Sequence, residues 1–224
     1  MMEQPNRGRA NIVGNGSVGG GAYTSVRIVG EGEVLGALGC DTFTCTGNCT
    51  VFGPVRAGLF KQRGDVTVKG EWSGGHLKTL GQLTIEGSVR AAKLDIVGQL
   101  TAREFVETDN LKLQGAIEVN GLVNADQADI RLYGPSRVNE IGGGRIHVRL
   151  SRLTAMKEWL KPRHSTELSA ALIEGDDIHL EHTRADIVRG NRIHIGAGCV
   201  IGRVEYSQSL HVARSAKIGE EVQL

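Results

Sequence analysis

One stretch of the chain decides its fold: residues 77–91 read LKTLGQLTIEGSVRA. Apolar and polar residues alternate along it, which is the pattern of β-strands with one buried face. Two glycines, Gly81 and Gly87, interrupt the alternation and fit tight corners, where the backbone needs a positive φ. The stretch therefore predicts short strands joined by sharp corners.

The same pattern recurs through the first half of the chain at a fixed, short period. The first glycine column comprises Gly30, Gly47, Gly64, Gly81, Gly98 and Gly115. An apolar column four residues further on comprises Val34, Val51, Val68, Ile85, Ala102 and Val119. A fixed short period indicates one unit stacked on itself. We predict an all-β fold, a triangular β-solenoid with about 17 residues per coil and about 4.8 Å between coils. A β-sandwich is the alternative, but it would not keep these columns in register.

The repeat also sets the expected domain organisation. Residues 1–24 are polar and glycine-rich, so we expect a flexible N-terminal tail. Residues 25–150 form the solenoid, and residues 151–172 form a short helical insert or linker, with the helix over 152–161. Residues 173–224 return to the strand pattern and are expected to add C-terminal solenoid coils.

Composition narrows the class of protein. The chain has 26 basic and 25 acidic residues and a formal net charge of +1, so its overall charge favours no nucleic-acid partner. It contains no apolar run of about 20 residues that could span a bilayer, and residues 1–10 do not resemble a signal peptide. We expect a cytoplasmic protein, with weak membrane association as the alternative.

Three of the four cysteines, Cys40, Cys45 and Cys49, fall on inward columns of the repeat. Their spacing, C-x4-C-x3-C, is not that of a zinc site. We expect them, with Cys199, to pack in the core, where a free cysteine behaves as a small apolar residue.

One outward column is mostly basic and could form a stripe along the solenoid. Its basic residues are Arg27, Lys61, Lys78, Lys112 and Arg131, and it is expected to continue as His147, His179, His194 and His211. The stripe could bind an acidic partner or anionic lipid, or it could be an ordinary solvated face. His179 and His182 point to opposite sides of a strand, so we predict no metal site.

The sequence carries no catalytic motif and no phosphate-binding loop. We therefore expect no catalytic residue, no cofactor and no enzyme activity. The nearest enzyme class, the left-handed β-helix enzymes, has three hexapeptides per coil of 18, whereas the six-residue spacing occurs here once per coil.

The repeats resemble the bactofilins, bacterial cytoskeletal proteins that form filaments without nucleotide. Residues 172–181 (LIEGDDIHLE), 185–192 (ADIVRGNR) and 196–199 (GAGC) are similar to the longer members from bacilli, the polymer-forming cytoskeletal proteins. The resemblance implies a right-handed β-helix that assembles end to end. It also implies a scaffolding role beside the cell-envelope or motility machinery.

The ends of a solenoid support the same expectation physically, because they expose unpaired backbone groups and an open apolar bore. We expect a homopolymer whose interface comprises Val26, Ile28, Leu210, Val212 and Ile218. The alternatives are a monomeric binding module that uses the basic and histidine stripe, and a β-helix enzyme.

The expected helix has four apolar residues on one face: Leu153, Met156, Trp159 and Leu160. We expect this face to pack against the solenoid or to cover one of its ends. The alternative is membrane contact, because basic residues flank the tryptophan.

Overall fold

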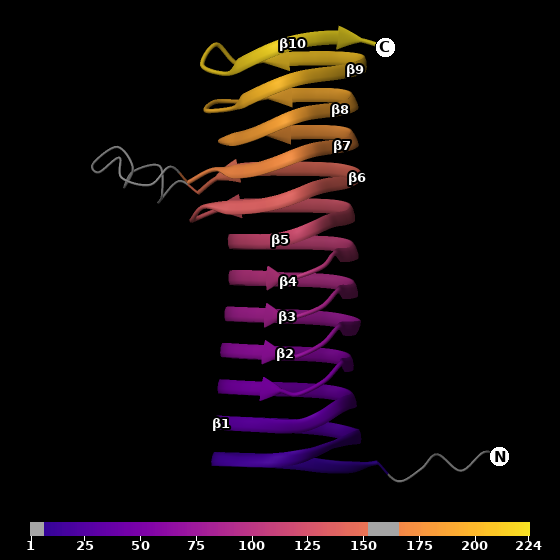
Figure 1. Cartoon of the computed structure of the whole chain (residues 1–224), viewed down its shortest axis with the longest axis vertical. Coiled ribbons are helices and arrows are strands. Elements are labelled where there is room, and N and C mark those ends of the chain that lie inside the picture. Colours follow the sequence, from indigo (N-terminus) through magenta and orange to yellow (C-terminus); the bar gives the residue numbers. More distant parts are fainter. Residues whose placement is uncertain (1–6, 152–165) are drawn as a thin grey trace, which may run out of the picture.

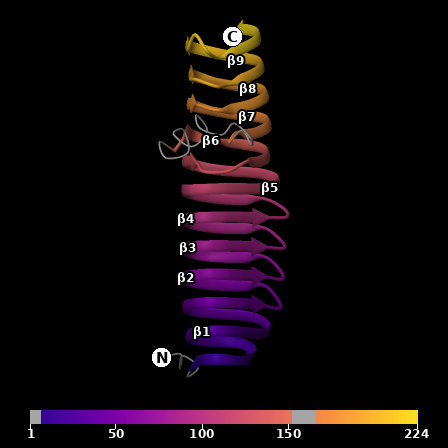
Figure 2. The ribbon, with the colours of Figure 1, turned by 90° about the vertical axis from the view of Figure 1, so that its left-hand side faces the viewer.

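The computed structural model describes residues 7–151 and 166–224, which form a β-solenoid (Figure 1, Figure 2). The strands of the described residues form one parallel sheet in sequential order. Their bounds are β1 Gly8–Val51, β2 Val55–Val68, β3 Trp72–Ile85, β4 Val89–Ala102, β5 Val106–Leu132, β6 Ser136–Leu150, β7 Leu168–Leu180, β8 Thr183–Ile195, β9 Val200–Val212 and β10 Lys217–Gln223. The predicted all-β solenoid of about 17 residues per coil is confirmed.

From β1 to β5, each residue pairs with the residue one sequence repeat further along the chain, so the strand register matches the repeat. One inward column pairs in the order Phe43, Phe60, Leu77, Leu94 and Leu111, and all five side chains are fully buried. The rings of Phe43 and Phe60 stack with their centroids 4.3 Å apart, and Trp72 meets Phe60 edge-on at 6.1 Å. Each apolar side chain is therefore buried by the same position of the next coil, which one coil alone could not achieve.

Each coil has three faces, and each face contributes two inward side chains. In one coil these pairs are Phe43 and Cys45 on the first face, Cys49 and Val51 on the second, and Val55 and Ala57 on the third. The first corner lies at Gly47, the second at residues 52–54 and the third at Gly58.

Glycine is required at the first corner of the early coils. Gly47 has a φ of +118°, and a Cβ atom there would lie 2.1 Å from the carbonyl oxygen of Gly30 in the coil below. Gly98 repeats this geometry further along the rod, with a φ of +127° and a Cβ position 2.0 Å from the oxygen of Gly81. Any side chain would strain the backbone and collide with the neighbouring coil.

The loops change corner along the rod. In the early coils they lie at the second corner, at residues 52–54, 69–71, 86–88 and 103–105. In the later coils they lie at the first corner, at residues 133–135, 181–182, 196–199 and 213–216. Figure 1 shows the change as thin connections on the right below β5 and loops on the left above it. Strand β5, of 27 residues, runs through both corners and marks the transition.

Two expected boundaries need correction. Strand β1 begins at Gly8, so the prediction of a flexible tail is wrong for residues 8–24, which form the first coil. Their glycines serve corners: a Cβ on Gly30 would lie 2.4 Å from the oxygen of Gly14. Strand β7 begins at Leu168, inside the segment expected as insert, and the helix expected over 152–161 lies outside the described residues.

The C-terminal coils continue the same stack. Ile146 of β6 pairs with Ile178 of β7, which pairs with Ile193 of β8 and then with Leu210 of β9. The bore therefore passes the segment between β6 and β7 without interruption.

Candidate interaction surfaces

The C-terminal end of the rod exposes part of the bore. Leu210, Val212 and Ile218 are half-buried, whereas the equivalent residues of inner coils are fully buried. Strand β10 pairs only with β9 among the strands described here. The outer edge of β10 thus carries backbone groups without a strand partner, and the structure places the three predicted residues in the last two strands.

The N-terminal end differs from the prediction. Val26 and Ile28 are at most 1% exposed, because the coil formed by residues 8–24 covers them. They are therefore not the outermost bore residues. Among the described residues that place is taken by Ile12, which is the first buried residue of the core, and by Ala10 and Val18, which are partly buried and pack against the core. Sequence reasoning missed them because they alternate with glycines that resemble a linker.

The basic stripe on the first face is in register through its central coils. Thr44, Lys61, Lys78, Asp95 and Lys112 pair in that order, and the three lysines are exposed. Arg27 lies one repeat before Thr44 in the sequence and is also exposed.

Arg131 does not belong to the same column. It pairs with Arg149, whereas Asp129 pairs with His147. The extra residues of this coil lie at the loop 133–135, after Arg131, so the early period holds up to Asp129. Asp129 also receives both hydrogen bonds from Arg149 at 3.0 Å. The stripe thus changes from basic to mixed charge before the histidines begin.

The four histidines form a ladder on the first face, as predicted. They pair from β6 to β9 in the order His147, His179, His194 and His211. Their ring centroids are successively 4.7, 4.3 and 4.8 Å apart, and the two central rings are almost parallel, at 8°. Such contact suits neutral imidazoles, because protonated rings at this distance repel.

The electrostatics of the ladder agree with neutral rings. Partial burial lowers the pKa of His147, His179 and His194 below the ordinary value, and nearby positive charge lowers it further. For His147 that charge is on Arg149, and for the next two rings it is the charge that the preceding histidine of the ladder carries when it is protonated. Within residues 7–151 and 166–224, no three histidine, cysteine or acidic side chains converge as a metal site would require.

The cysteines are buried, as predicted. Burial raises the pKa of Cys40 and of Cys199 to about 11. A hydrogen bond between the thiols of Cys45 and Cys49 raises the pKa of Cys49 and lowers that of Cys45. At neutral pH, Cys40, Cys49 and Cys199 are therefore thiols rather than nucleophilic thiolates.

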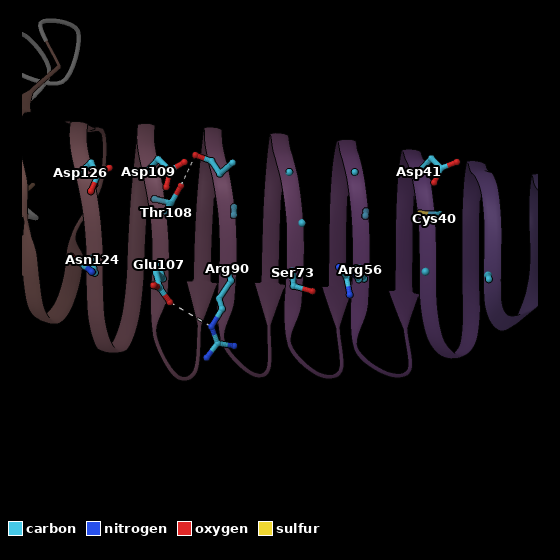
Figure 3. A pocket seen from close by; sticks show the side chains of 18 of the residues that line it. Cys40, Asp41, Arg56, Ser73, Arg90, Glu107, Thr108, Asp109, Asn124 and Asp126 are labelled. Carbon is cyan, nitrogen blue, oxygen red and sulfur yellow. Dashed lines mark hydrogen bonds and ion pairs between the residues drawn. The ribbon is translucent and has the colours of Figure 1, made fainter. Parts of the chain in front are cut away.

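A groove of about 1000 Å³ runs across the early coils along the third corner (Figure 3). One rim carries Asp41, Asp109 and Asp126, and the opposite wall carries Arg56, Ser73, Arg90, Glu107 and Asn124. Sequence reasoning did not predict it, because the groove arises where the corner residues are small.

The expected apolar face of the insert, Leu153, Met156, Trp159 and Leu160, lies outside the described residues. Among the residues that are described, no helix is long and apolar enough to cross a membrane.

The fold and these surfaces define a β-solenoid with an open strand edge and long ordered columns on its faces. The chain is similar to two Bacillus subtilis (strain 168) proteins, YhbE and YhbF, both named uncharacterized. It is 40% identical to YhbE over 109 residues, which is 47% of this chain and 44% of YhbE. It is 35% identical to YhbF over 105 residues, or 46% of this chain and 42% of YhbF. The chain thus spans less than half of each relative. No protein-family model and no solved structure matches it.

Proposed function

We propose that the chain is a structural scaffold that polymerises end to end, without nucleotide, through the ends of its solenoid. The observation that supports this most directly is the C-terminal end, where the outer edge of β10 has no partner among the described strands and Leu210, Val212 and Ile218 are only half covered. An open strand edge beside an apolar surface is a template for another strand.

The N-terminal end offers a matching surface. Ile12 and Ala10 lie on the first face, the same face that Leu210 and Val212 occupy at the other end. Stacking one end on another would extend the bore and the sheet, just as each coil does within the rod. Because the repeat geometry does not close on itself, such contacts produce open filaments. Cell-envelope or motility machinery as the partner, and a cytoplasmic location, remain part of this proposal and rest on the bactofilin resemblance.

The test is a charge placed in the junction. Val212→Lys puts an ammonium group in the bore at the C-terminal end, and His211→Lys adds the same charge to the outer surface one residue away. We expect Val212→Lys to keep its melting curve but to stop at monomers or dimers in sedimentation velocity. His211→Lys should form filaments like the parent in negative-stain micrographs.

The two possible products of Val212→Lys have different meanings. Dimers would show that only this end is blocked and that N-terminal ends meet each other. Unchanged filaments would contradict a C-terminal junction. Ile12→Lys, with Val13→Lys as its exposed control, tests the other end in the same way, because Val13 is 73% exposed.

A binding module is the second candidate, supported by the register of Lys61 and Lys78 on one exposed face. It predicts a monomeric parent at high concentration and physiological salt. Light scattering on the full chain separates the two functions.

A further inference from the structure

The groove along the third corner has a floor almost free of side chains. Over three successive coils it is lined by Ala57, Gly58, Gly74, Gly75, Ala91 and Ala92. Figure 3 shows this bare stretch between Asp41 at one end and Asp109 at the other. A floor without protruding side chains leaves room for the side chains of a bound segment.

The rim beyond this floor is acidic. Asp109 and Asp126 are exposed, lie one coil apart, and form no ion pair within the described part of the chain. Asp41 is already paired with Arg7 at 2.9 Å. Arg90 on the opposite wall is held by Glu71 and Glu107 at 3.7 and 3.5 Å. Arg56, which is exposed and lines the same wall, lies three coils away from Glu107, so the negative charge is confined to the end of the groove at Asp109 and Asp126, where it favours a cationic partner.

The chain itself supplies a segment of matching chemistry. Residues 152–165 read RLTAMKEWLKPRHS, with four basic residues, one acidic residue and four large apolar ones. We propose that residues 152–165 of a second copy of this chain dock in the groove. Their apolar side chains rest on the bare floor, and Lys157 and Lys161 pair with Asp109 and Asp126.

Reach favours a second copy over the chain's own segment. The segment leaves Ser151 at the first corner, whereas the groove lies at the third corner, where Gly144 stacks on Asp126. Ser151 lies seven steps along the chain from Gly144, across the first face, which is about 23 Å at ~3.3 Å per residue. A 14-residue segment is about 46 Å long when fully extended, and because it is fixed at both ends it can reach out only about half of that length, ~23 Å. Its tip alone would reach the groove, so both lysines could not pair.

The test measures binding of a fluorescent peptide of residues 152–165 to the full chain by anisotropy at low ionic strength. The protein carries Lys157→Glu and Lys161→Glu, so that its own segment does not compete. We expect saturable binding that weakens roughly tenfold when Asp109→Asn and Asp126→Asn are added. Ala92→Trp, which fills the floor from an exposed position without changing charge, should weaken it at least as much.

Matched variants separate the groove from general charge. Asp65→Asn removes an exposed carboxylate on the second face and should leave binding unchanged. A groove with Asp109→Lys and Asp126→Lys should prefer a peptide carrying Lys157→Glu and Lys161→Glu. Parent-like binding by the Ala92→Trp protein, an equal loss in the Asp65→Asn protein, or no binding at all would overturn the proposal.

Micrographs distinguish this proposal from end-to-end assembly. The Asp109→Asn, Asp126→Asn protein should still form filaments but lose side-by-side contacts between them. Loss of the filaments themselves would instead concern the solenoid ends. Docking does not require filaments, so the peptide measurement stands if the proposed function fails.

Discussion

The coils before β5 and those after it turn the same three corners in different ways. The early coils use glycine with positive φ at the first corner and a loop at the second. The later coils place their loops at the first corner and run straight through the second, and their described corners include only Gly198 and His182 with positive φ. The bore is continuous across both regions.

The difference shows which property of a coil is fixed. Leu38 pairs with Val55 in the early coils, and Leu168 pairs with Thr183 in the later ones, so the later coil is slightly shorter. The coil from Ile146 to its partner Ile178 is nearly twice as long as an early coil, yet the inward column stays in register. The packing of inward pairs, rather than the corner or the coil length, therefore defines the repeat.

The largest expected loss of stability comes from a charge in the bore, and it tests whether the early and the later coils are both held together by a buried apolar core. Leu94→Asp in the early coils and Ile178→Asp in the later ones each bury a carboxylate without a partner, at a cost of several kcal/mol. Both should abolish or strongly lower the thermal transition followed by circular dichroism. Lys61→Asp, on the outer side of the same face between Thr44 and Lys78, is the control and should melt like the parent. A bore variant with a parent-like melt would show that the assigned register is wrong.

The next largest loss of stability should occur in the early coils but not in the later ones, when a glycine at the first corner is replaced. Gly98→Ala forces a side chain into a backbone with φ +127° and against the oxygen of Gly81, so we expect a loss of about 2–4 kcal/mol. Gly134→Ala lies in a loop at the same corner of a later coil, where the nearest atom is 3.7 Å away. Its unfolding free energy should change by less than about 0.5 kcal/mol. Equal losses in urea denaturation would contradict the contrast between the corners.

The smallest effect is confined to the later coils and depends on pH. Because the pKa values of His147, His179 and His194 are lowered in the folded state, the unfolded chain binds more protons near pH 6.5. Stability should therefore fall as pH drops through that value and level off below the folded pKa values. The carboxylates of Asp129 and Glu181 oppose this trend, and Arg149 and Arg131 reinforce it.

The measurement is hydrogen exchange at pH 8 and pH 5.5, with melting curves as support. We expect faster exchange in β6 to β9 at the lower pH and a melting temperature lowered by roughly 2–4 °C. Replacing His179 and His194 by Gln should reduce the dependence. A dependence located in β2 to β4 would show that other groups cause it.

The fold was predictable because the inward columns repeat, as the stacking of Leu94 on Leu111 confirms. The first coil was missed because Gly14 and its neighbours have the composition of a linker, and composition does not reveal that a glycine stacks on Gly30. Arg131 was misplaced because counting residues cannot decide on which side of it an insertion falls. The groove was missed because it results from small residues at a corner, such as Gly74 and Gly75, and small residues alone do not show that a hollow forms there.

The near-identity of the early coils has a consequence for folding. If a coil docked one full repeat out of place, its inward residues would pack against almost the same residues as in the native register. Only contacts that do not repeat from coil to coil disfavour such a shift. The edge-on meeting of Phe60 and Trp72 is one such contact. In a one-dimensional stack, order propagates from neighbour to neighbour. The irregular later coils differ from one another, so a shift by one repeat would mismatch their columns, and we expect them to specify the register of the stack more strongly than the uniform early coils do.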